Sequence, residues 1–468
     1  MKTKHILITI LCAISFTACE LDFLPTAALS SDTMTKELYG SLLVGAYDGV
    51  QSSSMGLKFL ADDTAADNLN TASWFTPMDR GVTTPDFSYI LTWWNEYFST
   101  IERCNNFILT VDGSDSPDSY TSMKGEACIL RAYCYYRLSC LYGPVPIVLK
   151  RTLEPTPRNT EVEVWTQIKN DLEYGMANAP NFTNFAIANK AAAKALLARV
   201  FLVAPEGVRD LAKAKQYAEE IIALGTFKLA TNYEDIFWKG TSSEFILAWK
   251  NTTNDNVSVG WFLRSNLTDP NPSSVTIDAG RYETPVDQSL MRAFEPGDQR
   301  TRISVRYIKT PSGSESWDCV KYPTQTPGNP NPVVRISEMY LTSAEAAGYP
   351  AGVARLNDVR VARGLPALEA GTDITASNFL YKIMAERRVE FCFESMRYYD
   401  LRRWFNSGAQ GKADVLSFRT YQPGEPAGSR PTASDMFNIA DNGYNLLLPI
   451  GSSAIANNPA LAPNNPGY

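Results

Sequence analysis

Histidine is nearly absent from this sequence of 468 residues, in which His5 is the only one. His5 lies in a short N-terminal segment with the features of a secretory signal, so we expect the mature chain to contain none. Nucleophile systems that depend on a histidine base, and zinc sites built from imidazole, are therefore excluded. The eight cysteines form no Cys-x-x-Cys pair, which also argues against a structural zinc site.

Several other features of binding proteins and enzymes are missing as well. After the N-terminal segment no apolar run reaches the length of about 20 residues that a membrane-spanning helix needs. A net charge of −7 disfavours nucleic acid as a partner, and Gly-rich phosphate-binding loops are lacking. The acidic window 61–64 lacks the glycine and the terminal glutamate of a calcium-binding hand. We expect no cofactor. The sequence does not decide whether loop oxygens hold a single calcium ion.

Residues 1–18 have the pattern of a bacterial lipoprotein signal. Lys2 and Lys4 supply a basic start, an apolar run covers 6–16, and small residues lead to Cys19. Cleavage before Cys19 makes this residue the expected site of lipidation, and several acyl chains there would hold the mature chain, 19–468, on a membrane. Phe16 departs from the usual aliphatic residue, and the alternative is an ordinary secreted protein.

Helical periodicity dominates the mature chain. Apolar positions spaced for one helix face predict helices over 36–51, 93–111, 124–142 and 161–178. A clearer pair of helices covers 189–203 and 209–224, with small alanines that allow close packing. A second pair covers 333–347 and 351–363, and a long helix is expected over 379–404. Such helix pairs have tetratricopeptide character.

Between the helical blocks the composition shifts to Pro, Gly, Asn, Ser and Thr, with aromatic residues interleaved. We expect a helical scaffold mainly over 36–61, 93–227 and 333–405. The loop-rich parts are a first insertion (62–92), a second insertion (228–332) and a third insertion (406–445). Loops of this length are usually functional, and their aromatics argue against disorder. The predicted fold is mostly α, an α-α superhelix of tetratricopeptide-like pairs with an irregular region packed against it.

Five segments of the chain resemble the SusD/RagB family of starch-utilisation proteins. They are the mature start 19–25, the helix and aromatic-Gly-x-Val-Pro turn at 131–146, and the segments 356–366, 386–404 and 447–468, the last ending in Asn-Pro-Gly-Tyr. Segment 356–366 is one residue shorter than the family pattern. Because the five segments follow the family order from one end of the chain to the other, the resemblance is specific.

The resemblance implies a surface-exposed outer-membrane lipoprotein with four tetratricopeptide-like helix pairs and a less regular part packed against them. It implies a lid on a TonB-dependent transporter of the SusC type, and binding of oligosaccharides for import without hydrolysis. Two alternatives come from other classes of protein: a glycoside hydrolase, and a helical-repeat adaptor or adhesin that binds no glycan.

A carboxylate pair lies within the predicted helix 379–404. Glu390 and Glu394 are one turn apart, and Arg387 and Arg397 fall on the same face. Two such acids could divide the acid and base work of glycoside cleavage. The alternation of Arg, Glu, Glu and Arg favours mutual ion pairs instead, and a paired carboxylate stays ionised rather than serving as a general acid. We interpret this stripe as structural.

Aromatic residues of the insertions are the better candidates for ligand contact. Aromatic planes cover the apolar faces of sugar rings, while neighbouring polar side chains bond the hydroxyls. The candidates are the aromatic residues Trp74, Phe75, Trp93, Tyr282 and Trp317 and the polar residues Asp67, Asn68 and Arg80. The alternative is that the aromatics fix their own loops onto the scaffold. A shared site requires the first and second insertions to meet.

Overall fold

The computed structural model describes residues 36–51, 61–70, 75–250, 263, 277–278, 280, 284–309, 315–324, 329–418 and 439–468. Within these residues the fold is mostly helical, with two small antiparallel sheets of two strands each. Among the described helices, none has both the length and the apolar character needed to cross a membrane.

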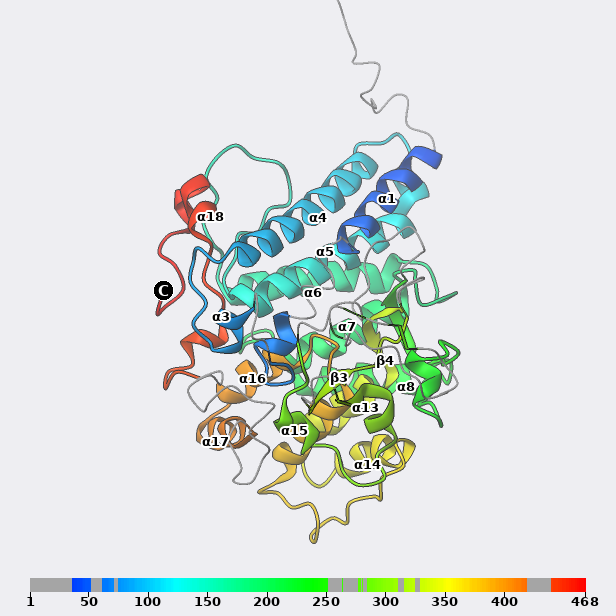
Figure 1. Cartoon of the computed structure of the whole chain (residues 1–468). Coiled ribbons are helices and arrows are strands. Elements are labelled where there is room, and N and C mark those ends of the chain that lie inside the picture. The colour runs from blue at the N-terminus through cyan, green and yellow to red at the C-terminus, as the bar shows by residue number, and fades with distance from the viewer. Residues whose placement is uncertain are drawn as a thin grey trace, which may run out of the picture.

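Eight of the described helices form four packed pairs. These are α1 (Lys36–Val50) with α4 (Ser88–Asp112), α5 (Thr121–Tyr142) with α6 (Glu161–Asn178), α7 (Lys190–Val203) with α8 (Leu211–Ala223), and α13 (Ile336–Ala347) with α14 (Val353–Ala362). Successive pairs also touch, through α4 and α5, α6 and α7, and α8 and α13 (Figure 1). Stacking of each pair on its neighbours is the tetratricopeptide-like arrangement, so the predicted fold class is confirmed.

Side-chain caps set the starts of several of these helices. Thr160 and Glu163 form a capping box at α6, in which the Glu163 carboxylate accepts the Thr160 N–H at 2.8 Å. Asn189 accepts the Ala192 N–H at 2.9 Å before α7, and Asp210 caps α8 in the same way. Each cap satisfies a backbone donor that the helix leaves unpaired. The predicted pair 189–203 and 209–224 therefore begins within two residues of the observed helices.

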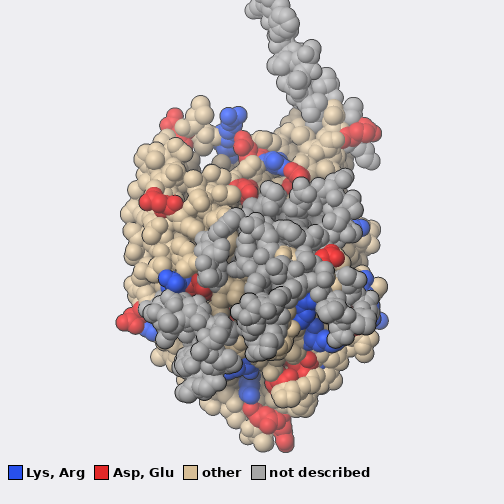
Figure 2. Space-filling view, viewed as in Figure 1, with Lys and Arg blue, Asp and Glu red and all other residues tan. Residues whose placement is uncertain are grey.

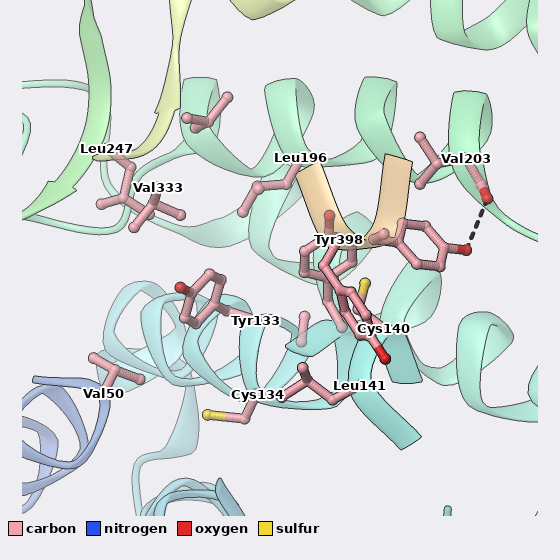
Figure 3. Close-up of a cluster of buried hydrophobic side chains, with 14 of the residues drawn as sticks. Val50, Tyr133, Cys134, Cys140, Leu141, Leu196, Val203, Leu247, Val333 and Tyr398 are labelled. Atoms are coloured by element: carbon pink, nitrogen blue, oxygen red, sulfur yellow. Dashed lines mark hydrogen bonds between the residues drawn. The ribbon is translucent and has the colours of Figure 1, made fainter. Parts of the chain in front are cut away.

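The core of the helical layer is built around α5, which is buried on nearly every face beyond Gly125. Figure 3 shows Cys134 and Cys140 among Tyr133, Leu141 and other apolar side chains from neighbouring elements. All six described cysteines are buried and free, and three of them, Cys128, Cys134 and Cys140, lie on α5.

Shorter elements complete the described chain. Strand β1 (Phe245–Trp249) pairs with β4 (Asn331–Arg335), and β2 (Val305–Lys309) pairs with β3 (Glu315–Cys319). The short helices are α3 (Thr76–Asp79), α9 (Glu234–Phe237), α11 (Gln288–Met291), α12 (Gln299–Ser304), α17 (Ala409–Phe418), α18 (Ser452–Asn457), and the 3-10 turns η2 (Pro117–Tyr120), η5 (Tyr444–Leu446) and η6 (Pro459–Leu461).

The prediction of a single helix over 379–404 is wrong. Two helices are present, α15 (Phe379–Glu390) and α16 (Arg397–Phe405). Between them Phe393 and Ser395 have positive φ angles of 63° and 59°, which an α-helix does not allow. The buried carboxylate of Asp63 accepts the N–H groups of both residues, at 2.9 Å and 3.3 Å. A tertiary contact therefore overrides the helical periodicity of this segment.

Candidate functional site

The first and second insertions meet beside strand β3. The Asn70 N–H donates to the Pro285 carbonyl at 2.8 Å, and Leu69 and Val286 form an isolated antiparallel bridge. Val286 in turn donates its N–H to the carbonyl of Trp317 at 2.9 Å. We call this contact of 67–70 with 284–289 the insertion junction. It is the meeting of the two insertions that a shared aromatic site requires.

Arg388 of α15 holds the insertion junction from the inside. Its buried guanidinium donates to the Asp67 carbonyl at 2.6 Å, the Asn68 amide oxygen at 3.1 Å and the Ser289 hydroxyl at 2.7 Å. A planar guanidinium with five donors in fixed directions is suited to joining two segments in this way. The sequence analysis did not single out Arg388, because its partners are more than ninety residues away in the chain.

Asp67 and Asn68 lie inside the insertion junction. Both side chains are buried, and Asp67 has a positive φ of 65°. Asp67 accepts from Arg397 at 3.3 Å, and Asn68 donates to Asp63 at 2.7 Å. Their predicted contact with sugar hydroxyls stays untested, but these positions favour a role in building the junction.

Phe75 and Trp93 are also inside the molecule, each 1% exposed. Their rings are nearly parallel with centroids 6.2 Å apart, and Tyr89 packs against both, at 4.8 Å and 6.0 Å. A ring with so little exposed surface cannot cover a sugar face. For these two residues the structure favours the alternative reading, in which the aromatics fix their own loop onto the scaffold.

The β2–β3 hairpin carries an accessible aromatic surface. Trp317 is half-buried and lies opposite Tyr307, which is 47% exposed, with ring centroids 5.3 Å apart. The adjacent pair, Arg306 and Asp318, forms an ion pair of 2.9 Å, and neighbouring positions of a strand face opposite sides. Tyr307 was missed in the sequence analysis. The run Val-Arg-Tyr-Ile-Lys at 305–309 is rich in residues that favour strands, which was the available signal for a strand there.

Three candidates remain. Trp74 and Tyr282 lie outside the described residues. Arg80 is exposed at the end of α3, where its backbone N–H donates to the Thr76 carbonyl at 3.0 Å. Within the described part of the chain, no cluster of three or more His, Cys, Asp or Glu side chains is arranged to hold a metal ion.

Glu390 and Glu394 belong to a buried ion-pair cluster, which agrees with a structural role for these two acids. Arg335 donates to both carboxylates, at 2.5 Å and 2.9 Å. Arg363 bonds Glu390 at 2.7 Å, and Lys321 bonds Glu394 at 2.6 Å. Burial alone would raise the pKa of Glu390, but Arg363 and Arg335 hold this pKa well below its usual range. A general acid needs the opposite shift.

The partners expected for these two acids are wrong. Arg387 pairs with Asp400 at 2.8 Å, and Arg397 contacts Asp67 at 3.3 Å. The break after Glu390 explains the Glu394 and Arg397 part, because it takes these two residues off the helix face of α15. Arg387 stays one turn from Glu390 on α15 but pairs with Asp400 of α16.

Comparison with known proteins agrees with these observations. One family model, named SusD family, matches 318–468, and another, described as starch-binding associating with outer membrane, matches 21–202. A SusD-like protein of Bacteroides ovatus is 27% identical over 67% of this chain, and the match spans 65% of that relative, slightly less than two thirds of its length. A SusD-like protein of Formosa agariphila is 24% identical over 86% of this chain and 92% of its own.

The chain belongs to the SusD/RagB family. Solved structures of SusD-like proteins share its fold. A laminarin-binding SusD-like protein superimposes with a TM-score of 0.74 and 20% identity, covering 93% of this chain and 100% of its own. A structure with a xylogluco-oligosaccharide has a TM-score of 0.72 and 19% identity over 90% of this chain and 98% of its own.

Proposed function

We propose that this SusD/RagB protein is an outer-membrane lipoprotein that binds oligosaccharides and passes them to a SusC-like TonB-dependent transporter without cleaving them. One structural relative binds laminarin and another was solved with a xylogluco-oligosaccharide, and a matching family model names association with the outer membrane. The observation that carries the proposal is the insertion junction beside the Tyr307–Trp317 pair.

The proposed glycan site centres on the Tyr307–Trp317 pair and includes Trp74 and Tyr282. Trp74 follows Asn70 by four residues and Tyr282 precedes Pro285 by three, and Asn70 and Pro285 are hydrogen-bonded to each other. Aromatic side chains from three segments would cover the apolar faces of consecutive sugar rings. Arg80 is proposed to contribute hydrogen bonds to hydroxyls from the exposed end of α3.

Anchoring and delivery are further parts of the proposal. Lipidation at Cys19 would keep the protein on the membrane, next to its transporter. Stacked helix pairs form extended surfaces that commonly grip other proteins, so the helical layer is proposed to dock on the transporter. The buried, ionised state of Glu390 supports a binding role rather than catalysis.

Binding of defined glycans to variants of the soluble body, 20–468, tests the proposal. Wild type is titrated calorimetrically with laminarin, xylogluco-oligosaccharide and starch oligosaccharides. Tyr307→Ala should weaken the affinity for the bound glycan about tenfold, because one stacking contact contributes roughly 1–2 kcal/mol. Tyr381→Ala, on the partly exposed face of α15, serves as the matched control and should bind like wild type.

Two results would contradict the proposal. If Tyr307→Ala and Trp317→Ala both bind the glycan with wild-type affinity, the proposed site at the hairpin is wrong. Release of new reducing ends by the wild-type protein would favour a glycoside hydrolase instead.

A further inference from the structure

A separate cleft lies at the N-terminal half of α4. Its volume is about 350 Å³, within the range of roughly 300–1,000 Å³ that small-molecule sites occupy. Its walls come from α4, from the 143–160 loop that joins α5 to α6, and from the C-terminal segment around α18. Figure 1 shows this loop arching beside α4 and α18. The cleft shares no lining residue with the β2–β3 hairpin or the insertion junction.

One wall of the cleft is aromatic. Trp94 and Phe98 are one turn apart on α4, and their ring centroids are 4.9 Å apart. The indole of Trp94 is fixed from behind by the edge of Tyr142 at 5.2 Å. Trp93, from the same turn, is buried in the core. Of the two adjacent tryptophans, one therefore packs in the core and the other lines the cleft. Trp94 is only 7% exposed and Phe98 is half-buried, so the ring surface that a ligand can reach on this wall is mainly that of Phe98, which Trp94 holds in place.

The other walls are nearly uncharged and carry both apolar and polar groups. Their apolar side chains are Pro146, Val148, Leu153, Pro155, Ala454 and Leu461, and their polar groups are the amides of Asn457 and Asn458, the hydroxyls of Thr152 and Thr156 and the carboxylate of Glu154. Asn95 adds an amide from α4 itself. Lysine and arginine are absent from the residues that line the cleft. In the upper left of Figure 2, where Figure 1 has α18 and the 143–160 loop, few side chains are charged.

The loop and the C-terminal segment that carry these polar groups are held in place by the fold. Asn458 donates to the Thr156 carbonyl at 2.8 Å, which ties the loop to the C-terminal segment. Arg158 makes a second tie by donating to the Asn465 amide oxygen at 2.7 Å. Fixed polar groups and a fixed ring pair make a preformed site, since little entropy is lost when a ligand enters.

The chemistry of the walls defines the ligand. Phosphates and carboxylates are disfavoured, because the lining supplies no cation and Glu154 repels anions. A ligand with apolar C–H faces and many neutral hydroxyls matches a cleft that combines the Phe98 ring and other apolar side chains with amides and hydroxyls. We propose that this cleft is a second saccharide-binding site, distinct from the one at the Tyr307–Trp317 pair. It does not depend on the hairpin site.

Two sites on one chain would change how the protein handles glycans. A short oligosaccharide would occupy each site independently. A glycan long enough to reach both would bind more tightly, because the second contact forms at a high effective concentration.

The test compares two sets of variants by calorimetric titration of the 20–468 body with laminarin, xylogluco-oligosaccharide and starch oligosaccharides. The cleft variant is Asn95→Leu with Asn457→Leu, both exposed positions whose amides line the cleft. The hairpin variant is Tyr307→Ala with Trp317→Ala. Asn106→Leu, also exposed on α4 but outside the cleft, is the matched control.

We expect wild type to bind two short oligosaccharides per chain. Each variant should lose one of them, with at least a tenfold weaker affinity at the altered site, and the control should keep both. Unchanged melting temperatures exclude unfolding as the cause. If only the hairpin variant loses binding, the second site is wrong while the proposed function stands. If only the cleft variant loses it, the second site stands and the hairpin site is wrong.

Two further outcomes also overturn the second site. Wild type that binds none of the glycans contradicts it. Normal glycan binding by the cleft variant, combined with lost association with the transporter, would make the cleft a protein-docking groove.

Discussion

Glu126 of α5 is a partly buried carboxyl group at the contact with α1. It accepts a hydrogen bond from the Tyr47 hydroxyl at 2.6 Å, and that hydroxyl accepts the Ala188 N–H at 2.8 Å. Burial raises the pKa of Glu126 to about 7, although the bond from Tyr47 acts in the opposite direction. The folded protein therefore keeps a proton on Glu126 at a pH where the unfolded chain has lost it.

Glu126→Gln should change how stability depends on pH. A raised folded-state pKa contributes stability that is complete below the unfolded value of 4.5 and is lost as pH rises through about 7. Glutamine has no proton to lose, so the variant escapes this loss. We expect the free energy of unfolding of Glu126→Gln, taken relative to wild type, to rise by about 2–3 kcal/mol from pH 4.5 to pH 8. Urea denaturation at both pH values measures this gain. Glu102→Gln, at an exposed position of α4, is the control. An equal difference at both pH values would contradict the prediction.

Individual residues also show which features of the candidate site the sequence could not predict. Trp317 was singled out as a candidate for ligand contact and is half-buried in the structure, and the meeting of the insertions was stated as a requirement. Phe75 and Asn68 have similar loop contexts, yet both are buried. Loop composition does not determine which side of a loop faces the scaffold. That choice depends on distant partners such as Arg388, which only the folded chain brings close.

At the scale of elements, helices α5 and α6 approach each other unusually closely. A Cβ atom on Gly125 would lie 2.5 Å from the backbone nitrogen of Ala179, at the end of α6. Glycine is the one residue that fits there without moving the backbone. The contact lies in the layer that places the insertions, so its geometry matters beyond the two helices.

Gly125→Ala should therefore destabilise the protein by about 1–3 kcal/mol, because the added methyl group overpacks the helix contact. Helix propensity alone predicts the opposite sign, since alanine favours a helix over glycine by about 1 kcal/mol. Gly45→Ala in α1 separates the two effects, because a Cβ atom there meets nothing within 4 Å. We expect this control to be as stable as wild type or more stable in chemical denaturation. Equal stability of both variants would contradict the close-approach argument.

Element boundaries show which physical signals a sequence carries. Helices with strong periodicity and capping residues, such as α6 and α7, were predicted within a few residues. The break after Glu390 was not predicted, because it depends on the carboxylate of Asp63. Local patterns determine where helices form, whereas contacts between distant segments determine where some of them stop.

At the scale of the whole molecule, the buried ion-pair cluster joins the second insertion to the helical pairs. Glu390 at the end of α15 accepts from Arg335 of β4, from Arg363 after α14 and from Arg300 of α12. The side chains of all four residues are at most 1% exposed. A buried cluster of this kind is costly to break, because the remaining charges stay desolvated.

Glu390→Gln should lower the free energy of unfolding by about 3–5 kcal/mol at neutral pH. Arginine holds the pKa of Glu390 low, so its contribution is present above the unfolded pKa and is lost only as pH falls through the lower folded value. The deficit of the variant should therefore shrink in strong acid. Glu369→Gln, at an exposed position, is the control for denaturation at pH 7 and pH 3. Glycan cleavage by wild type that the variant lacks would contradict the structural role.

Attachment to the membrane is the last predicted property at this scale, and we propose that it depends on Cys19 alone. Because the predicted anchor is covalent and outside the folded body, Cys19→Ala should fold normally but lose fatty-acid label and leave the membrane fraction. Labelling with a radioactive or alkyne fatty acid, followed by fractionation of cells that lack the transporter, measures both effects. Cys12→Ala changes a cysteine of the apolar run and should keep label and location. If Cys19→Ala stays labelled and membrane-bound, the lipoprotein prediction is wrong, and the protein must reach the membrane by other contacts.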